Sequence, residues 1–199
     1  LSPRWELEAV LADRGSLEDL SGGLRVMAYL DTFDLWFGAA KVFEDLSIMG
    51  ALRATIDILS IRLEVLANYD LKRSVVQRPK ATIGLDLYPD PDWALQLELH
   101  YQGLGAEWGQ AYSNTPELER GESFLLGQVY GGITAHWRPT PLSALSLFGI
   151  VNPADPSGLL GWRFTYDVWQ DVEFGVGAFH GVGERFKITE GSLQDEFGA

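Results

Sequence analysis

The clearest regularity in this chain is a two-residue alternation of apolar and polar side chains. In residues 93–102, every odd position is apolar or aromatic, whereas the even positions include Gln96, Glu98 and His100. Successive side chains of a β-strand point to opposite faces, so the pattern predicts a strand with one apolar and one polar face. The same sorting occurs in residues 61–70 and 161–170. We therefore expect an all-β protein.

The alternation predicts an antiparallel, up-and-down arrangement of about eleven strands, whose connections alternate between short and long. Short turns on one rim and longer loops on the other are typical of transmembrane β-barrels. Short connections are predicted at residues 32–33, 59–60, 89–91, 138–141 and 170–171, and longer ones at 14–23, 70–79, 103–122 and 152–158. The predicted strands lie near residues 4–13, 24–31, 34–43, 51–58, 61–69, 80–88, 93–102, 123–137, 142–151, 159–169 and 172–182.

Two of the short connections also predict a register. A turn at residues 59–60 places Asp57 opposite Arg62, and a turn at residues 89–91 places Leu87 opposite Trp93. In both hairpins polar side chains then face polar ones and apolar side chains face apolar ones. Both hairpins therefore favour antiparallel connections between consecutive strands.

Aromatic residues bear on which solvent covers the apolar face, because a soluble β-sandwich alternates too. If the short turns form one rim, Trp5, Trp93 and Trp137 lie at that rim on the apolar parity, and Tyr69, Tyr101 and Trp162 lie at the opposite rim. This distribution is similar to the two aromatic girdles of outer-membrane barrels, where the rings sit at the lipid headgroups. Over essentially its full length the sequence resembles the general class of porin-like bacterial outer-membrane β-barrel proteins. The resemblance implies contact with membrane lipid and a location in the outer membrane.

The polar parity carries charges that a barrel would direct into its lumen. We expect these charges to line a cation-selective channel for ions or small solutes, because acids outnumber bases among them. The alternative is a charge-paired, closed interior, in a scaffold barrel whose loops bind a partner protein. Asp31 is one of the expected lumen residues. The others are Glu6, Glu8, Arg25, Arg53, Asp57, Arg62, Glu64, Asp86, Glu98, Arg163, Asp167 and Glu173.

Some of these charges are expected to cancel and others to face each other. Asp57 and Arg62 would neutralise one another, which leaves the excess negative charge with Asp86 and the other acids. A turn centred on Gln170 places Asp167 opposite Glu173. Two close carboxylates could bind a cation, but structural pairing is the favoured interpretation.

Composition excludes several other functions. The chain has no cysteine, and its three histidines are far apart in sequence, so we expect no metal site and no cofactor. A net charge of −13 opposes nucleic-acid binding. No Gly-x-Ser-x-Gly motif indicates a hydrolase, and we expect no enzymatic activity. No run approaches the roughly 18 to 20 apolar residues of a membrane helix.

We expect residues 1–199 to form one barrel domain that lacks its closing strand. If the first strand rises from the short-turn rim, the eleventh strand rises too, whereas an even number of strands is usual. Residues 186–189 are too few to cross a membrane, where a strand needs about 9 to 11 residues. The complete barrel is therefore expected to have about 12 or more strands. Additional chain or a partner protein would then seal the edge.

Overall fold

A computed structural model describes residues 4–12, 20–107 and 125–183, and every regular element in these ranges is a β-strand. Of the twelve strands, β6 has two residues and each of the others has nine or more. The expected all-β fold is confirmed, and most strands lie within a few residues of their predicted positions. The strands are β1 (Arg4–Ala12), β2 (Ser21–Tyr29), β3 (Phe33–Val42), β4 (Asp45–Ile56), β5 (Leu59–Asp70), β6 (Val75–Val76), β7 (Lys80–Asp90), β8 (Trp93–Gln102), β9 (Val129–Thr140), β10 (Ser143–Asn152), β11 (Ser157–Trp169) and β12 (Val172–Val182).

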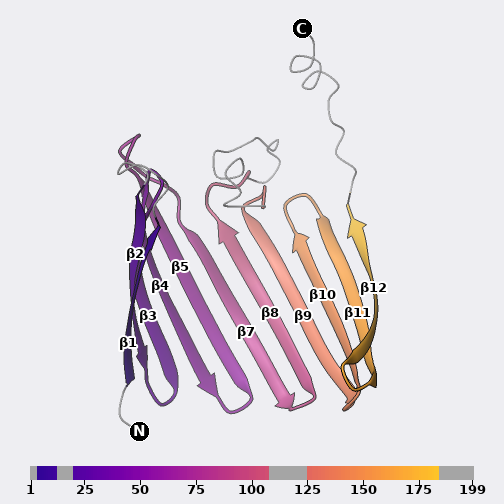
Figure 1. The fold of residues 1–199 in the computed structure, drawn as a ribbon. Coiled ribbons are helices and arrows are strands. Elements are labelled where there is room, and N and C mark those ends of the chain that lie inside the picture. Colours follow the sequence, from indigo (N-terminus) through magenta and orange to yellow (C-terminus); the bar gives the residue numbers. More distant parts are fainter. Residues whose placement is uncertain (1–3, 13–19, 108–124, 184–199) are drawn as a thin grey trace.

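The strands form a single antiparallel, up-and-down sheet. Its order is β1-β2-β3-β4-β5-β7-β8-β9-β10-β11-β12, and β6 pairs with β5 alone. The sheet curves into a trough (Figure 1), and within the described ranges β1 and β12 are its free edges. This arrangement is consistent with the wall of a barrel, although the sheet itself is open. That further strands complete the wall stays a prediction, and residues 186–189 lie outside the described ranges.

Short turns and longer connections lie at opposite ends of the trough, as expected (Figure 1). The exception is the two-residue turn at Phe43 and Glu44, because β4 begins at Asp45 instead of at residue 51. The alternation is weak at this point, since Met49 lies on the same face as the polar Ser47. Part of the longest predicted loop, residues 108–122, is outside the described ranges, as are residues 14–19.

Two predicted hairpin registers are wrong, by four residues at the β4–β5 turn and by two residues at the β7–β8 turn. β4 turns at Asp57 and Ile58, where Asp57 has φ 53°, so Arg62 lies opposite Arg53 and not opposite Asp57. Similarly, Leu87 lies opposite Leu95 instead of Trp93. A shift by an even number of residues keeps each side chain on its face, because strand side chains alternate with a period of two. The prediction of faces therefore survives the error in register.

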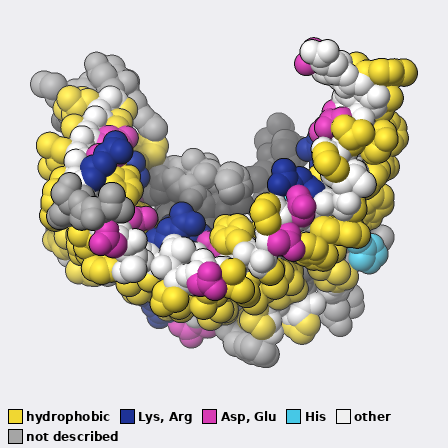
Figure 2. Space-filling view, turned by 90° about the horizontal axis from the view of Figure 1, so that it is seen from below, with side chains coloured by type: hydrophobic (Ala, Val, Ile, Leu, Met, Phe, Trp, Pro, Cys, Tyr) yellow, Lys and Arg dark blue, Asp and Glu magenta, His cyan; other side chains and the backbone are white. Residues whose placement is uncertain are grey.

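The distribution of side chains is the reverse of that in a soluble protein. Figure 2 shows hydrophobic side chains over the convex surface of the sheet and acidic and basic side chains inside the trough. In the described part of the chain, Ala28 is the one buried hydrophobic residue. The buried polar and charged residues are Ser21, Asp45, Ser47, Ser60, Asp70, Asp86, Gln102, Ser143 and Asn152. Within the described ranges, no helix is long and apolar enough to cross a membrane.

Candidate functional site: the concave face

The concave face brings together nearly all of the expected lumen residues. Directly paired residues of antiparallel neighbours point to the same face, so the cross-strand registers trace each face across the sheet. Asp57 and Asp31 are exceptions in the expected set, because neither lies in a strand; Asp57 is in the β4–β5 turn. Asp31 lies in the bend between β2 and β3. The residues that share the concave face are Glu6, Glu8, Arg25, Arg53, Arg62, Glu64, Asp86, Glu98, Arg163, Asp167 and Glu173.

A partly buried ion pair lies near the middle of this face, between β5 and β7. The Arg62 guanidinium donates two hydrogen bonds to the Asp86 carboxylate, at 2.9 Å from Nε and 3.1 Å from Nη2. Glycine at position 84 makes room for this geometry, since a Cβ there would come within 2.9 Å of the Arg62 Nη2. Asp86 is only 2% exposed, whereas Arg62 also lies 3.6 Å from the partly exposed Glu98. Asp86 is therefore neutralised by Arg62, contrary to the expectation that it adds to the excess negative charge.

The fully buried hydroxyl of Ser60, also on β5, links this cluster to Arg53 and Thr55 of the neighbouring strand β4. Ser60 accepts a 3.0 Å hydrogen bond from Arg53 Nε and lies 3.2 Å from the Thr55 hydroxyl. Arg53 and Arg62 face each other across β4 and β5, and each is held by a different polar partner. The two like charges are thus accommodated side by side on the concave face.

The outer strands of the sheet carry further ion pairs. At one edge Arg25 pairs with Glu8, and at the other Arg163 lies 3.1 Å from Glu173. Asp167 lies directly opposite Glu173, as predicted. The register arises differently from the prediction, because a two-residue turn at residues 170–171 is combined with a bulge between Asp167 and Trp169.

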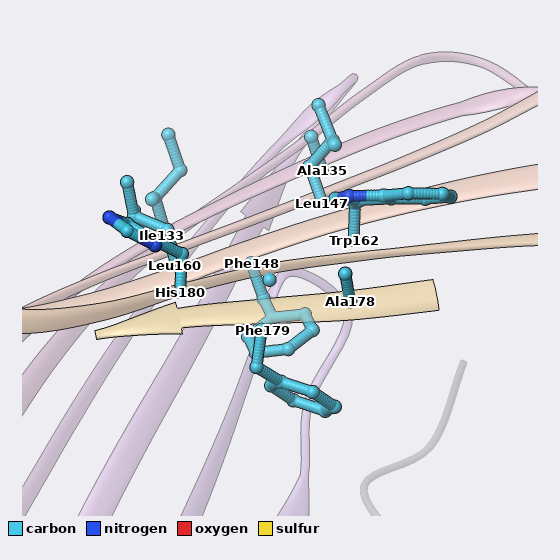
Figure 3. A pocket seen from close by; sticks show the side chains of 10 residues that line it. Ile133, Ala135, Leu147, Phe148, Leu160, Trp162, Ala178, Phe179 and His180 are labelled. Carbon is cyan, nitrogen blue, oxygen red and sulfur yellow. The ribbon is translucent and has the colours of Figure 1, made fainter. Parts of the chain in front are cut away.

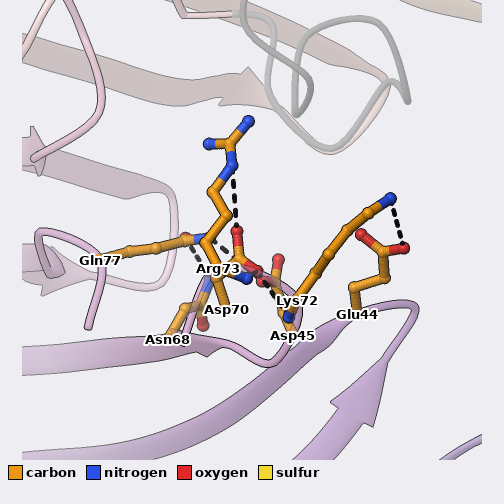
Figure 4. A network of polar contacts seen from close by, with 7 residues as sticks. All are labelled: Glu44, Asp45, Asn68, Asp70, Lys72, Arg73 and Gln77. Atoms are coloured by element: carbon orange, nitrogen blue, oxygen red, sulfur yellow. Dashed lines mark hydrogen bonds and ion pairs between the residues drawn. The ribbon is translucent and has the colours of Figure 1, made fainter. Parts of the chain in front are cut away.

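A polar network closes the concave face at the rim of the longer connections (Figure 4). The Asp70 carboxylate accepts hydrogen bonds from the backbone N–H groups of Lys72 and Arg73, at 2.9 Å and 2.8 Å. Gln77 donates a 3.0 Å hydrogen bond to Asp45, which lies opposite Asp70. The connection between β5 and β7 is therefore held at the ends of β4 and β5 by hydrogen bonds from its backbone and from the Gln77 side chain.

A second contact at this rim joins two connections. Arg78 lies 2.6 Å from Glu107, which belongs to the β8–β9 connection. The hydrogen bond and the charge of Glu107 raise the pKa of Arg78 above its ordinary value, so its guanidinium stays charged. Both side chains are exposed, so this pair is expected to contribute little to stability.

The convex face carries the expected aromatic residues. Trp93 and Trp137 are stacked near the short-turn end, with ring centroids 5.3 Å apart and planes inclined by 22°. Trp5 also lies near the short-turn end, and Tyr69 and Tyr101 lie near the ends of their strands at the opposite rim. Trp162 differs from the prediction, because it lies several residues inside β11 instead of at its end.

Several residues that share these faces were not predicted. Asp34 and Lys80 lie on the concave face, and the exposed Trp169 lies beside the β11–β12 turn. The alternation could have identified Lys80, because it shares its parity with Thr82 and Asp86. Asp34 gives no such signal, since its parity in β3 continues with Trp36 and Gly38. His100 and His136 also face the trough, where they lie within hydrogen-bond distance of Thr82 and Ser146.

A hollow of about 600 Å³ lies along β9–β12 (Figure 3). Its lining combines convex residues such as Leu160 with Phe148 and Phe179 of the concave face. Because the backbone of the sheet separates these two groups, the hollow is not one enclosed binding cavity. Nor do three or more His, Asp or Glu side chains of the described residues converge as metal ligands.

Comparison with protein families and with curated proteins identifies no relative of this chain. No model of a protein family matches the chain, and no curated protein shows significant sequence similarity to it.

Proposed function

We propose that this sheet is part of the wall of a porin-like channel in a bacterial outer membrane, and that the channel conducts ions or small solutes with a preference for cations. The observation that carries the proposal is the reversed burial: in the described ranges, polar side chains are buried and large apolar ones are exposed. A soluble β-sandwich covers its apolar face with a second sheet. Here the described residues form one sheet, so lipid is the solvent that best matches the convex face.

The convex face supports contact with lipid. Leu97, Ile133, Leu147 and Leu160 are exposed on four consecutive strands, β8–β11, and all four lie on this face. Large exposed apolar patches mark contact with a membrane or with another protein. The aromatic residues near the strand ends favour a membrane, because Trp and Tyr are enriched at lipid headgroups.

The concave face supports a preference for cations. Three of its arginines, Arg25, Arg62 and Arg163, each lie beside an acid, so their positive charges are balanced locally. Glu64 and Asp167 are exposed additional acids on the same face. Walls of low dielectric constant focus such a field along a pore, which raises the local concentration of cations.

Conductance measurements test the proposal. The protein is extracted from its native outer membrane, so that any strands that complete the wall are present, and is inserted into planar bilayers. We expect discrete current steps, and in a KCl gradient a reversal potential of the sign produced by K⁺ permeation. An anion-selective current would contradict the proposed selectivity. Persistent absence of current would instead support the scaffold barrel with a closed lumen.

A further inference from the structure

The two edges of the sheet differ from its interior because each has a neighbour on one side only. In the described part of the chain, β1 pairs with β2, and β12 pairs with β11. Every residue of β12 is exposed. If the sheet lies in lipid, as the proposed function requires, the free N–H and C=O groups of this edge need partners, because the hydrocarbon offers none.

Direct pairing of β12 with β1 is the least compatible solution. Eleven long strands alternate in direction, so β1 and β12 run the same way, and pairing them would produce a parallel ladder. This holds for β1 of the same chain and for β1 of a second copy inserted in the same orientation. Every ladder in the described sheet is antiparallel. In addition, Figure 2 shows a wide opening between the two arms of the trough, whereas one strand spans only about 4.8 Å.

We infer that the free edge of β12 is a docking site for an added antiparallel strand that comes from outside the described sheet and places a small residue opposite Phe179. The requirement for a small residue comes from the position of Phe179. Phe179 lies on the concave face, is 71% exposed, and its ring centroid is 5.2 Å from that of Phe148.

On the paired side of β12, strand β11 shows how the sheet accommodates the Phe179 side chain. Phe179 lies opposite Gly161 of β11, and the Phe148 ring lies over Gly161, where a Cβ would overlap the ring. Large and small residues therefore alternate across β10, β11 and β12 in this row. A glycine or alanine in the next strand continues the alternation and leaves room for the Phe179 ring.

Besides Phe179 and Glu173, the concave positions of β12 are glycines. Gly175, Gly177 and Gly181 have no side chains, so larger residues fit opposite them. On the convex face Phe174 and Val176 are exposed, which calls for apolar residues in the neighbouring strand. The partner is therefore an amphipathic strand that is apolar toward lipid and has one small residue among larger ones toward the trough.

Cross-linking tests this inference, and the absence of cysteine from the chain makes every engineered thiol unambiguous. The 199-residue chain with Val176→Cys is reconstituted in phospholipid vesicles together with a synthetic strand of eleven residues, the length of β12. The strand carries one cysteine and has alanine at the position opposite Phe179. A matched control strand exchanges this alanine with a tryptophan from another trough-facing position. We expect disulfide formation with the first strand to be about tenfold more efficient, because a tryptophan opposite Phe179 would overpack the site.

Other outcomes would overturn the inference. Equal cross-linking of the two strands would remove the role of Phe179. A disulfide within a Leu7→Cys/Val176→Cys chain, or between two such chains, would show that β1 covers the edge. Flotation of the vesicles separates this test from the proposed function: a chain that floats but does not capture the strand contradicts the docking site alone. A chain that does not float contradicts the membrane location, and cross-linking in detergent then still tests the edge.

Discussion

Replacing Asp86 by asparagine tests whether the central ion pair stabilises the sheet. The substitution keeps the shape of the side chain and one acceptor oxygen but removes its charge, so the two hydrogen bonds from Arg62 lose their charged acceptor. Hydrogen bonds to charged groups contribute about 1.5 to 3 kcal/mol. Arg62 keeps partial compensation from Glu98 at 3.6 Å and from its own 27% exposure. We therefore expect a loss of about 2 kcal/mol in the free energy of unfolding.

Urea-induced unfolding of the reconstituted protein, followed by tryptophan fluorescence, measures this loss. Glu98→Gln is the matched control, because Glu98 lies farther from Arg62 and is 44% exposed, and it should cost less than about 1 kcal/mol. A double-mutant cycle with Arg62→Gln should give a coupling energy of about 1 to 2 kcal/mol. If Asp86→Asn costs no more than Glu98→Gln, or if the two substitutions at 62 and 86 are additive, the pair does not stabilise the wall.

Three further predictions concern the two faces. Leu97→Arg places a charge on the convex face and should lower the free energy of unfolding in vesicles by roughly 2 to 4 kcal/mol if the site lies near the bilayer midplane; a variant of wild-type stability would contradict contact with lipid. Gly161→Ala should cost about 1 to 3 kcal/mol in unfolding experiments because its methyl group overlaps the Phe148 ring, and Phe148→Ala should remove most of this penalty. Combined Glu64→Gln and Asp167→Asn substitutions should move the reversal potential toward zero and lose their effect at high salt, whereas an unchanged potential would exclude these acids from the conduction path.

The sequence predicted the strands and their faces because both depend on local alternation. Leu95, Leu97 and Leu99 alternate with Gln96, Glu98 and His100, and this pattern needs no knowledge of the neighbouring strands. The alternation did not predict the start of β4, because Met49 occupies a concave position there and reduces the contrast between the faces.

Register and charge pairing were less predictable because they depend on turn geometry. A turn placed two residues away preserves every face but changes each cross-strand partner. Arg62 was therefore assigned to Asp57, although its partner Asp86 lies on β7, 24 residues away along the chain. The small residue that makes this contact possible, Gly84, gives no signal of its role in the sequence alone.

Single-cysteine labelling along β8 tests the opposite solvation of the two faces most directly. Each residue from Leu95 to His100 is replaced in turn by cysteine, labelled with an environment-sensitive fluorophore and reconstituted in vesicles, and the cysteine-free chain provides the background. Labels at 95, 97 and 99 should be quenched by spin-labelled lipid, and labels at 96, 98 and 100 by aqueous iodide. Uniform quenching along the strand, or the reverse alternation, would contradict a convex face in lipid and a concave face in water.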